Sequence, residues 1–226
     1  MQDPSTVMSC KLIVMGVGGV GKSAITNRFV RGRWIAKYDP TIEESYQKSC
    51  EVDGTVLQVE ILDTAGQDAY TSLRETFMHT GDGFMLVYSI TDDDTLDRLQ
   101  EIHEQIQKAH PDPNVPILIV GNKSDMEKDR AVTADEGKIY ATKVGGTFQE
   151  VSAKNNRNVS EAFDELLRAI VKKGNTNATS GGNVFGSSKD TSGDDFVYAS
   201  SGGGKAAAAK ASEPKKSGFF AKCEIL

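Results

Sequence analysis

The sequence predicts an α/β fold with a mostly parallel six-stranded sheet, one antiparallel strand and helices on both faces. Strand-like apolar runs alternate with helical patterns along residues 10–173, an order typical of parallel sheets covered on both sides. Asp53-Gly54 separates two strand-like runs and is a strong hairpin signal, which adds the antiparallel strand. Polar motifs follow four of the strands, at the edge where such sheets bind ligands.

The predicted elements follow one another along this domain. Strands are expected at residues 11–15, 46–52, 55–62, 83–90, 115–120 and 147–151. Helices are expected at 24–30, shortly before 80, at 91–110, from 133 onward and at 159–173. Thr91 is the expected cap of the third helix, and Pro111 ends it, because proline disfavours a helical residue before it. Thr133 and Glu136 form the pattern of a capping box at the fourth helix.

Length, charge and cysteine content limit the kinds of protein that this chain can be. The 226 residues suit one domain at 10–173, after a short extension at 1–9 and before a tail at 174–226. The tail is rich in Gly, Ser, Asn, Thr and Ala, and is expected to be disordered. A net charge of −6 argues against a nucleic-acid partner. Three cysteines suit a reducing cytosol, and no apolar run approaches the roughly 20 residues of a membrane span.

A glycine-rich motif, GVGGVGKS, occupies residues 16–23 between the first predicted strand and the first predicted helix. This is the phosphate-loop (P-loop) arrangement, and it predicts a P-loop nucleoside triphosphatase (NTPase) fold. Loop N–H groups and the helix dipole would hold phosphate, with Lys22 at the β- and γ-phosphates and the Ser23 hydroxyl on Mg²⁺. An ordinary glycine-rich turn is the alternative. The predicted nucleotide contacts are Gly18, Gly19, Val20, Gly21, Lys22, Ser23 and Ala24.

A second motif, Asp-Thr-Ala-Gly-Gln at residues 63–67, follows the third predicted strand. Asp63 would hold Mg²⁺ through a water molecule, as the acidic partner of Ser23, or would cap a turn. Gly66 offers a backbone N–H that no side chain obstructs. Gln67 carries both amide donors and an acceptor, so it can orient a water molecule without being a strong base. A solvated loop residue is the alternative for Gln67.

Two further motifs predict the choice of nucleobase. Asn122, Lys123 and Asp125 follow the fifth predicted strand, and Ser152-Ala153-Lys154 follow the sixth. A carboxylate only accepts hydrogen bonds, and guanine presents two neighbouring donors that adenine lacks, so Asp125 would select guanine. Ala153 would add a backbone N–H to the guanine carbonyl, and Lys123 and Lys154 would lie along the base. Asn-Lys-Ser-Asp alone is as well explained by an ordinary turn.

With these motifs in order, residues 11–173 resemble the Ras family of small GTPases. The five family motifs are residues 16–23, Thr41, residues 63–67, residues 122–125 and residues 152–154. Residues 38–46 resemble the effector segment of the Ras and Rap branch, and Gln67, in place of Thr, favours Ras over Rap. The resemblance implies a monomeric molecular switch that binds GTP or GDP with Mg²⁺, hydrolyses GTP to GDP and phosphate, and signals to effectors when GTP is bound.

The resemblance also implies roles for individual residues. Thr41 would ligate Mg²⁺ and touch the γ-phosphate, to which Gly66 would give its N–H. The catalytic group would be Gln67, Lys22, Thr41 and Gly66. Further nucleotide contacts would be Trp34, over the guanine where the family usually has Phe, with Tyr38 and Pro40. The effector segment would be Tyr38, Asp39, Pro40, Thr41, Ile42, Glu43, Glu44, Ser45 and Tyr46, with Glu44 replacing a more usual Asp.

The expected partners are exchange factors, GTPase-activating proteins and effectors. No Arg lies between Trp34 and Thr41, so hydrolysis is expected to be weak alone and to use an arginine from an activating protein. The last four residues, beginning with Cys223, fit a prenylation box that favours geranylgeranyl. Five lysines and two glutamates lie from residue 205 onward. A lipid and a basic patch are two anchoring signals, which predicts attachment to the cytoplasmic face of the plasma membrane.

Two other functions compete with a GTPase switch. A scaffold could bind GTP without turning it over, but Gly18, Thr41 and Gln67 argue against it. A metabolic P-loop kinase is the second alternative, and Asp125 argues against it because it would select guanine. Phosphate release in a single turnover separates the first alternative from the switch, and a panel of nucleotides separates the second.

Overall fold

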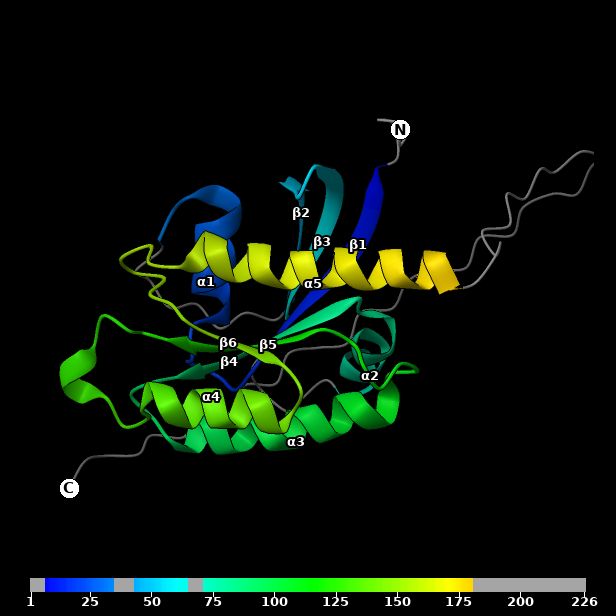
Figure 1. Ribbon diagram of the computed structural model, residues 1–226. Helices are drawn as coiled ribbons and strands as arrows, with labels where there is room; N and C mark the ends of the chain where they lie inside the picture. The colour runs from blue at the N-terminus through cyan, green and yellow to red at the C-terminus, as the bar shows by residue number, and fades with distance from the viewer. Residues whose placement is uncertain (1–6, 35–42, 65–70, 181–226) are drawn as a thin grey trace, which may run out of the picture. The chain divides into compact units, whose positions relative to one another are not determined.

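The computed structural model describes residues 7–34, 43–64 and 71–180, and these residues fold around one sheet (Figure 1). Its strands are β1 (Met8–Met15), β2 (Glu43–Val52), β3 (Thr55–Thr64), β4 (Gly83–Ser89), β5 (Ile117–Asn122) and β6 (Thr147–Glu150). Their order across the sheet is β2-β3-β1-β4-β5-β6. β2 pairs with β3 in antiparallel fashion, and the other neighbours are parallel. The predicted fold class is therefore confirmed.

Helices cover both faces of this sheet. They are α1 (Lys22–Arg31), α2 (Thr71–Thr80), α3 (Asp94–Ala109), α4 (Ala134–Lys143) and α5 (Val159–Ser180), with a short 3₁₀ helix η1 at Glu127–Asp129. Figure 1 shows α1 and α5 over one face and α3 and α4 over the other. Among the described helices, none is both long enough and apolar enough to cross a lipid bilayer.

The alternating faces of β1 explain why its second half, residues 12–15, is entirely apolar. Leu12 and Val14 belong to a core cluster that includes Phe29 of α1 and Phe163 of α5. Ile13 and Met15 belong to a second cluster, together with Met78 of α2, Leu99 of α3 and Ala141 of α4. Because successive side chains of a strand point to opposite faces, a stretch of strand that is covered on both faces is apolar at every position.

Local signals correctly predicted the start of α4 and the end of α3. Thr133 and Glu136 form both hydrogen bonds of the capping box at α4. α3 ends at Ala109, just before His110-Pro111, as predicted. Thr91, in contrast, does not cap α3, which begins later than expected. The Asp93 carboxylate accepts from the N–H of Asp94 at 3.1 Å, while the Thr91 hydroxyl lies 2.8 Å from that of Ser89.

Several elements extend further than predicted. β2 begins at Glu43 and β3 ends at Thr64, because the antiparallel ladder continues through polar residues to the pair Glu43–Thr64. α5 runs to Ser180, so its predicted end at Lys173 is wrong. Residues 174–180 contain no proline, and extending a helix costs less than starting one. α5 therefore crosses the predicted boundary between domain and tail.

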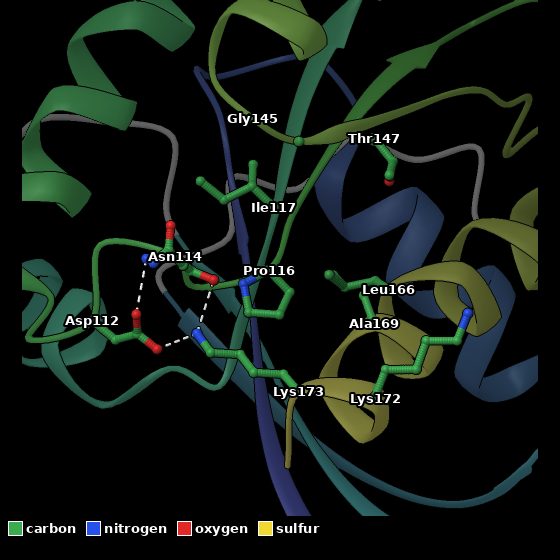
Figure 2. Close-up of a pocket in the computed structure, with 11 residues that line it drawn as sticks. Asp112, Asn114, Pro116, Ile117, Gly145, Thr147, Leu166, Ala169, Lys172 and Lys173 are labelled. Atoms are coloured by element: carbon green, nitrogen blue, oxygen red, sulfur yellow. Dashed lines mark hydrogen bonds and ion pairs between the residues drawn. The ribbon is translucent and has the colours of Figure 1, made fainter. Parts of the chain in front are cut away.

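The polar motifs meet at one edge of the sheet, and a cavity of about 500 Å³ lies at the opposite edge. β1, β3, β5 and β6 run in the same direction, so the residues that follow them come together. The cavity lies beside the start of β5, about 16 Å from its end by the rise of a strand. Figure 2 shows it between Pro116, Ile117 and Leu166, with Lys173 held by Asp112 and the Asn114 carbonyl. It contains none of the predicted site residues.

Candidate functional site

Two glycines allow the chain to turn sharply between β1 and α1. Gly16 and Gly21 have φ angles of 146° and 97°, and residues that carry a Cβ atom rarely adopt such positive φ angles. A Cβ atom on Gly16 would lie 2.2 Å from the Val87 carbonyl oxygen, and one on Gly21 would lie 2.3 Å from Nδ2 of Asn122. Gly21 is also the residue before the first turn of α1 and has no side chain to cap it. The backbone N–H groups of that turn can therefore donate hydrogen bonds to a bound anion.

Lys22 and Asp63 place opposite charges beside this loop. The Lys22 ammonium donates to the Val17 carbonyl at 2.9 Å, and the residue is only 5% exposed. Asp63 is fully buried on β3, where its register partners are Val14 of β1 and Glu44 of β2. The loop, the lysine and the acid therefore belong to one site.

The Asp63 carboxylate is buried in surroundings that offer it few hydrogen bonds. Neither of its oxygens has a hydrogen-bond partner within the described residues. Burial raises the pKa of Asp63 to about 6, while the Ser23 hydroxyl and the Lys22 charge oppose this increase and Glu44 adds to it. A buried carboxylate without partners costs several kcal/mol at the order-of-magnitude level. A cation at this position would offset that cost.

The available donors suit Mg²⁺. Ser23 provides a hydroxyl next to the buried carboxylate of Asp63. Within the described residues there is no cluster of three His, Cys, Asp or Glu side chains that could form an all-protein metal cage. Mg²⁺ does not need such a cage, because it is usually held by one or two carboxylates, water and substrate phosphates.

Asn122 connects the P-loop to the segment that follows β6. Its amide Nδ2 donates to the Val20 carbonyl at 2.8 Å, and its Oδ1 accepts from the N–H of Ala153 at 3.3 Å. The residue is 3% exposed. The sequence motif predicts a role for Asn122 in base choice, and the structure adds that it holds two loops together. That the Ala153 N–H donates to a guanine carbonyl stays a prediction.

Ser152 holds the carboxylate of Asp125 in place. Its hydroxyl donates to Asp125 Oδ1 at 2.6 Å and accepts from the N–H of Asn155 at 3.0 Å. The Lys154 ammonium lies 3.9 Å from Asp125 Oδ2. Lys123 has a positive φ of 69°, which marks a tight turn between Asn122 and Asp125. One oxygen of Asp125 is thus occupied, and the carboxylate is oriented before any ligand binds.

Sequence reasoning missed Arg28. Its guanidinium donates to the carbonyl oxygens of Ala153, Lys154 and Gly32. Nothing in the motifs could have identified it, because its partners are backbone atoms and two of them lie more than 120 residues away in sequence. Trp34, the predicted cover of the base, is 42% exposed.

The described part of the predicted effector segment is anchored beside this site. The Tyr46 hydroxyl donates to the Glu44 carboxylate, and burial, with that hydrogen bond, raises the pKa of Tyr46 to about 12. The Arg31 guanidinium lies 5.2 Å from the centre of the Tyr46 ring. Ser45 is exposed. The other predicted site residues lie outside the described residues: Tyr38, Asp39, Pro40, Thr41, Ile42, Gly66, Gln67, Cys223 and the side chain of Glu43.

A sheet of this order with a glycine-lined loop between β1 and α1 is typical of P-loop NTPases. Comparison with known proteins narrows this class, because the Ras family model matches residues 11–172. The chain is 46% identical over 162 residues to Ras-like protein rasW of Dictyostelium discoideum, covering 72% of this chain and 75% of the relative. It is 45% identical over 163 residues to Ras-like protein rasX of the same organism, covering 72% and 76%. Ras-like protein 1 of Saccharomyces cerevisiae is 44% identical over 166 residues, covering 74% and 54%.

This chain therefore belongs to the Ras family of small GTPases. It is an enzyme that hydrolyses GTP and a guanine-nucleotide switch. Membership of this family argues against the two alternatives, a scaffold that binds GTP without hydrolysis and a metabolic P-loop kinase.

Proposed function

We propose that this GTPase works with Mg²⁺ held by Ser23, Thr41 and Asp63, and that its GTP-bound form signals to effectors at a membrane surface. The buried carboxylate of Asp63, whose oxygens have no hydrogen-bond partner in the described part of the chain, is the observation that supports the metal site most strongly. Its own strand pairs directly with β2, where Glu44 lies opposite Asp63. This pairing supports a proposed metal site that is adjacent to the proposed effector segment.

The chemistry of each side chain indicates its role in binding phosphate, orienting water or recognising the base. N–H groups of the P-loop and the Lys22 ammonium bind the phosphates. Mg²⁺, when bound, neutralises charge on the β- and γ-phosphates. Gln67 orients the attacking water through its amide group, without having to act as a strong base. Asp125 accepts from the two donors of guanine, in the orientation that the Ser152 hydroxyl gives it.

The switch rests on two contacts to the third phosphate, from Thr41 and the N–H of Gly66. Hydrolysis removes both contacts, so the segments around residues 36–46 and 65–80 relax and effectors lose their surface. The position of β2 supports effector binding at this segment. β2 is an edge strand of the described sheet, and its residues Glu44 and Ser45 are exposed to a partner. Exchange factors reset the cycle, and activating proteins supply the missing arginine.

Affinity measurements in the two nucleotide states test this proposal. The full chain is loaded with GDP or with a non-hydrolysable GTP analogue, and partners are captured from a lysate of its own cells. We expect a set of proteins that bind the GTP-analogue form alone, and phosphate release that requires Mg²⁺. Identical partners and affinities in both states would rule out the switch mechanism for effectors.

The membrane proposal rests on Cys223 and the lysines from residue 205 onward, which lie outside the described residues. A geranylgeranyl group on Cys223 and the basic tail would together hold the chain at the cytoplasmic face of the plasma membrane. We expect Cys223→Ser to move the protein from the membrane to the soluble fraction. Substitution of Cys50, which lies within the sheet, serves as the control. Membrane association that persists in Cys223→Ser would contradict the lipid anchor.

A further inference from the structure

Arg28 on α1 uses its guanidinium to hold three backbone carbonyl groups. Nε donates to the Ala153 oxygen at 2.9 Å, and Nη2 donates to the Lys154 oxygen at 2.9 Å. Nη1 donates to the Gly32 oxygen at 3.1 Å. Arg28 is half-buried, and Ala153 is 3% exposed. These are charge-assisted hydrogen bonds, which are shorter and stronger than bonds between neutral groups.

The three carbonyls belong to the two sides of the predicted base pocket. Ala153 and Lys154 form one side, where the Ala153 N–H already contacts Asn122 Oδ1. Gly32 ends α1 with a φ of 65° and directs the chain toward Trp34, two residues later. Arg28 therefore connects the segment that follows β6 with the segment that leads to the predicted cover of the base.

The position of Arg28 on its helix joins this contact to the phosphate side of the site. α1 begins at Lys22 of the P-loop, and Arg28 lies six residues later, about 9 Å along the helix axis. A helix is rigid over that distance, so the loop that holds phosphate and the backbone around the base keep a constant separation. The contact uses backbone oxygens, and it needs a planar group with several donors, which arginine has and lysine lacks.

We propose that Arg28 is a positioning residue for the guanine base, which slows nucleotide release by fixing the backbone of residues 153–154 and Gly32. This inference rests on the proposed function, which gives Asp125 its base-binding role, and on the roles at the base that the sequence predicts for Ala153 and Trp34. Arg28 itself does not touch the nucleotide in this mechanism. It acts through the carbonyl groups that it holds.

The test measures the release of GDP from the full chain in the presence of Mg²⁺. Each variant is loaded with a fluorescent GDP derivative, and excess unlabelled GDP displaces it. We expect Arg28→Ala to release the nucleotide about tenfold faster than the wild type. Arg28→Lys keeps the charge and the aliphatic stem but loses the planar guanidinium with its several donors. We expect this variant to release the nucleotide several-fold faster than the wild type.

Arg168→Ala is the matched control, because Arg168 also spans two elements: its hydrogen bonds within the described residues join α5 to Asp53 in the β2–β3 turn. We expect it to release GDP at the wild-type rate. Acrylamide quenching of Trp34, the sole tryptophan, adds a local readout. Quenching of the GDP-bound form should become more efficient in both Arg28 variants and stay unchanged in Arg168→Ala.

Three results would overturn the inference. Arg28→Ala that releases GDP at the wild-type rate shows that the contact does not position the base. Arg28→Lys that releases GDP at the wild-type rate shows that a positive charge alone suffices and that the planar guanidinium is not needed. Equal acceleration in Arg168→Ala shows a general loss of stability. A wild-type chain that fails to retain GDP would instead contradict the proposed function, so the two failures are distinguishable.

Discussion

The side-chain amide of Asn122 donates to the backbone carbonyl of Val20 at 2.8 Å, across 102 residues of sequence. The same side chain accepts from the N–H of Ala153. One buried amide group thus connects the loop that precedes α1 to the loop that follows β6. Because Gly21 leaves no space for a Cβ atom beside Asn122 Nδ2, the loop and the amide fit closely. The two loops that are predicted to bind the nucleotide are therefore joined into one unit.

Asn122→Ala should destabilise the protein and accelerate nucleotide release together. It leaves the Val20 carbonyl and the Ala153 N–H without their partner, which costs about 1–3 kcal/mol for a buried group. Urea unfolding of the GDP-bound protein and the rate of GDP release measure the two effects. Asn155→Ala is the control, because Asn155 is exposed in the same region. If Asn122→Ala and Asn155→Ala behave alike, the connection between the loops has no energetic role.

Asp63→Asn should change stability in opposite directions with and without Mg²⁺. In the nucleotide-free protein with a chelator, the substitution removes a buried charge that Ser23 and Lys22 offset only in part, and we expect a gain of about 1–3 kcal/mol. With GDP and Mg²⁺ present, the loss of the carboxylate should weaken the stabilisation by the metal. Thermal unfolding under both conditions measures these changes. Asp129→Asn, at an exposed position in η1, should change neither value. A loss of stability in both conditions would argue against a metal site at Asp63.

Asp125→Asn should change the preferred base from guanine to xanthine. Xanthine has a carbonyl where guanine has its amino group, so an amide donor at residue 125 complements xanthine and not guanine. A site built around such hydrogen bonds can discriminate by about 10⁴-fold. Competition between GTP and xanthosine triphosphate for the purified protein measures the preference. Asp135→Asn, exposed on α4, is the control and should still prefer GTP. Retained preference for GTP in Asp125→Asn would exclude Asp125 as the selecting residue.

Cys10 should resist alkylation in the folded protein and become accessible only on unfolding. Burial raises the pKa of its thiol from 9.0 to about 12, and the charges of Asp82 and Cys50 add to this effect. The native state therefore keeps a proton that the unfolded chain loses above about pH 9, so this thiol makes stability fall as pH rises from about 9 to 12. Alkylation between pH 7 and 10, followed by mass spectrometry, compares Cys10 with the half-buried Cys50. Equal labelling rates would show that the buried position of Cys10 opens readily.

Short-range patterns account for the parts of the structure that could be predicted. The capping box of Thr133 and Glu136 involves residues three apart, and the Asp53-Gly54 turn joins strands that are adjacent in sequence. The helix cap at Asp93 was missed although it is local, because the Thr91 hydroxyl meets Ser89 instead of the first turn of α3. Residues 91–94 are all polar and able to cap a helix, and the contact of Thr91 with Ser89 at the end of β4 leaves Asp93 as the cap.

The sequence by itself determined the type of fold, the P-loop and the order of the motifs, because strand and helix periods and glycine-rich turns depend on neighbouring residues. Only the tertiary structure decided that Asn122 holds Val20, that Ser152 orients Asp125 and that Arg28 holds the backbone around Ala153. These contacts join residues that lie far apart in the chain. They arise because β1, β3, β5 and β6 end at the same edge of the sheet, which brings their loops within hydrogen-bonding distance.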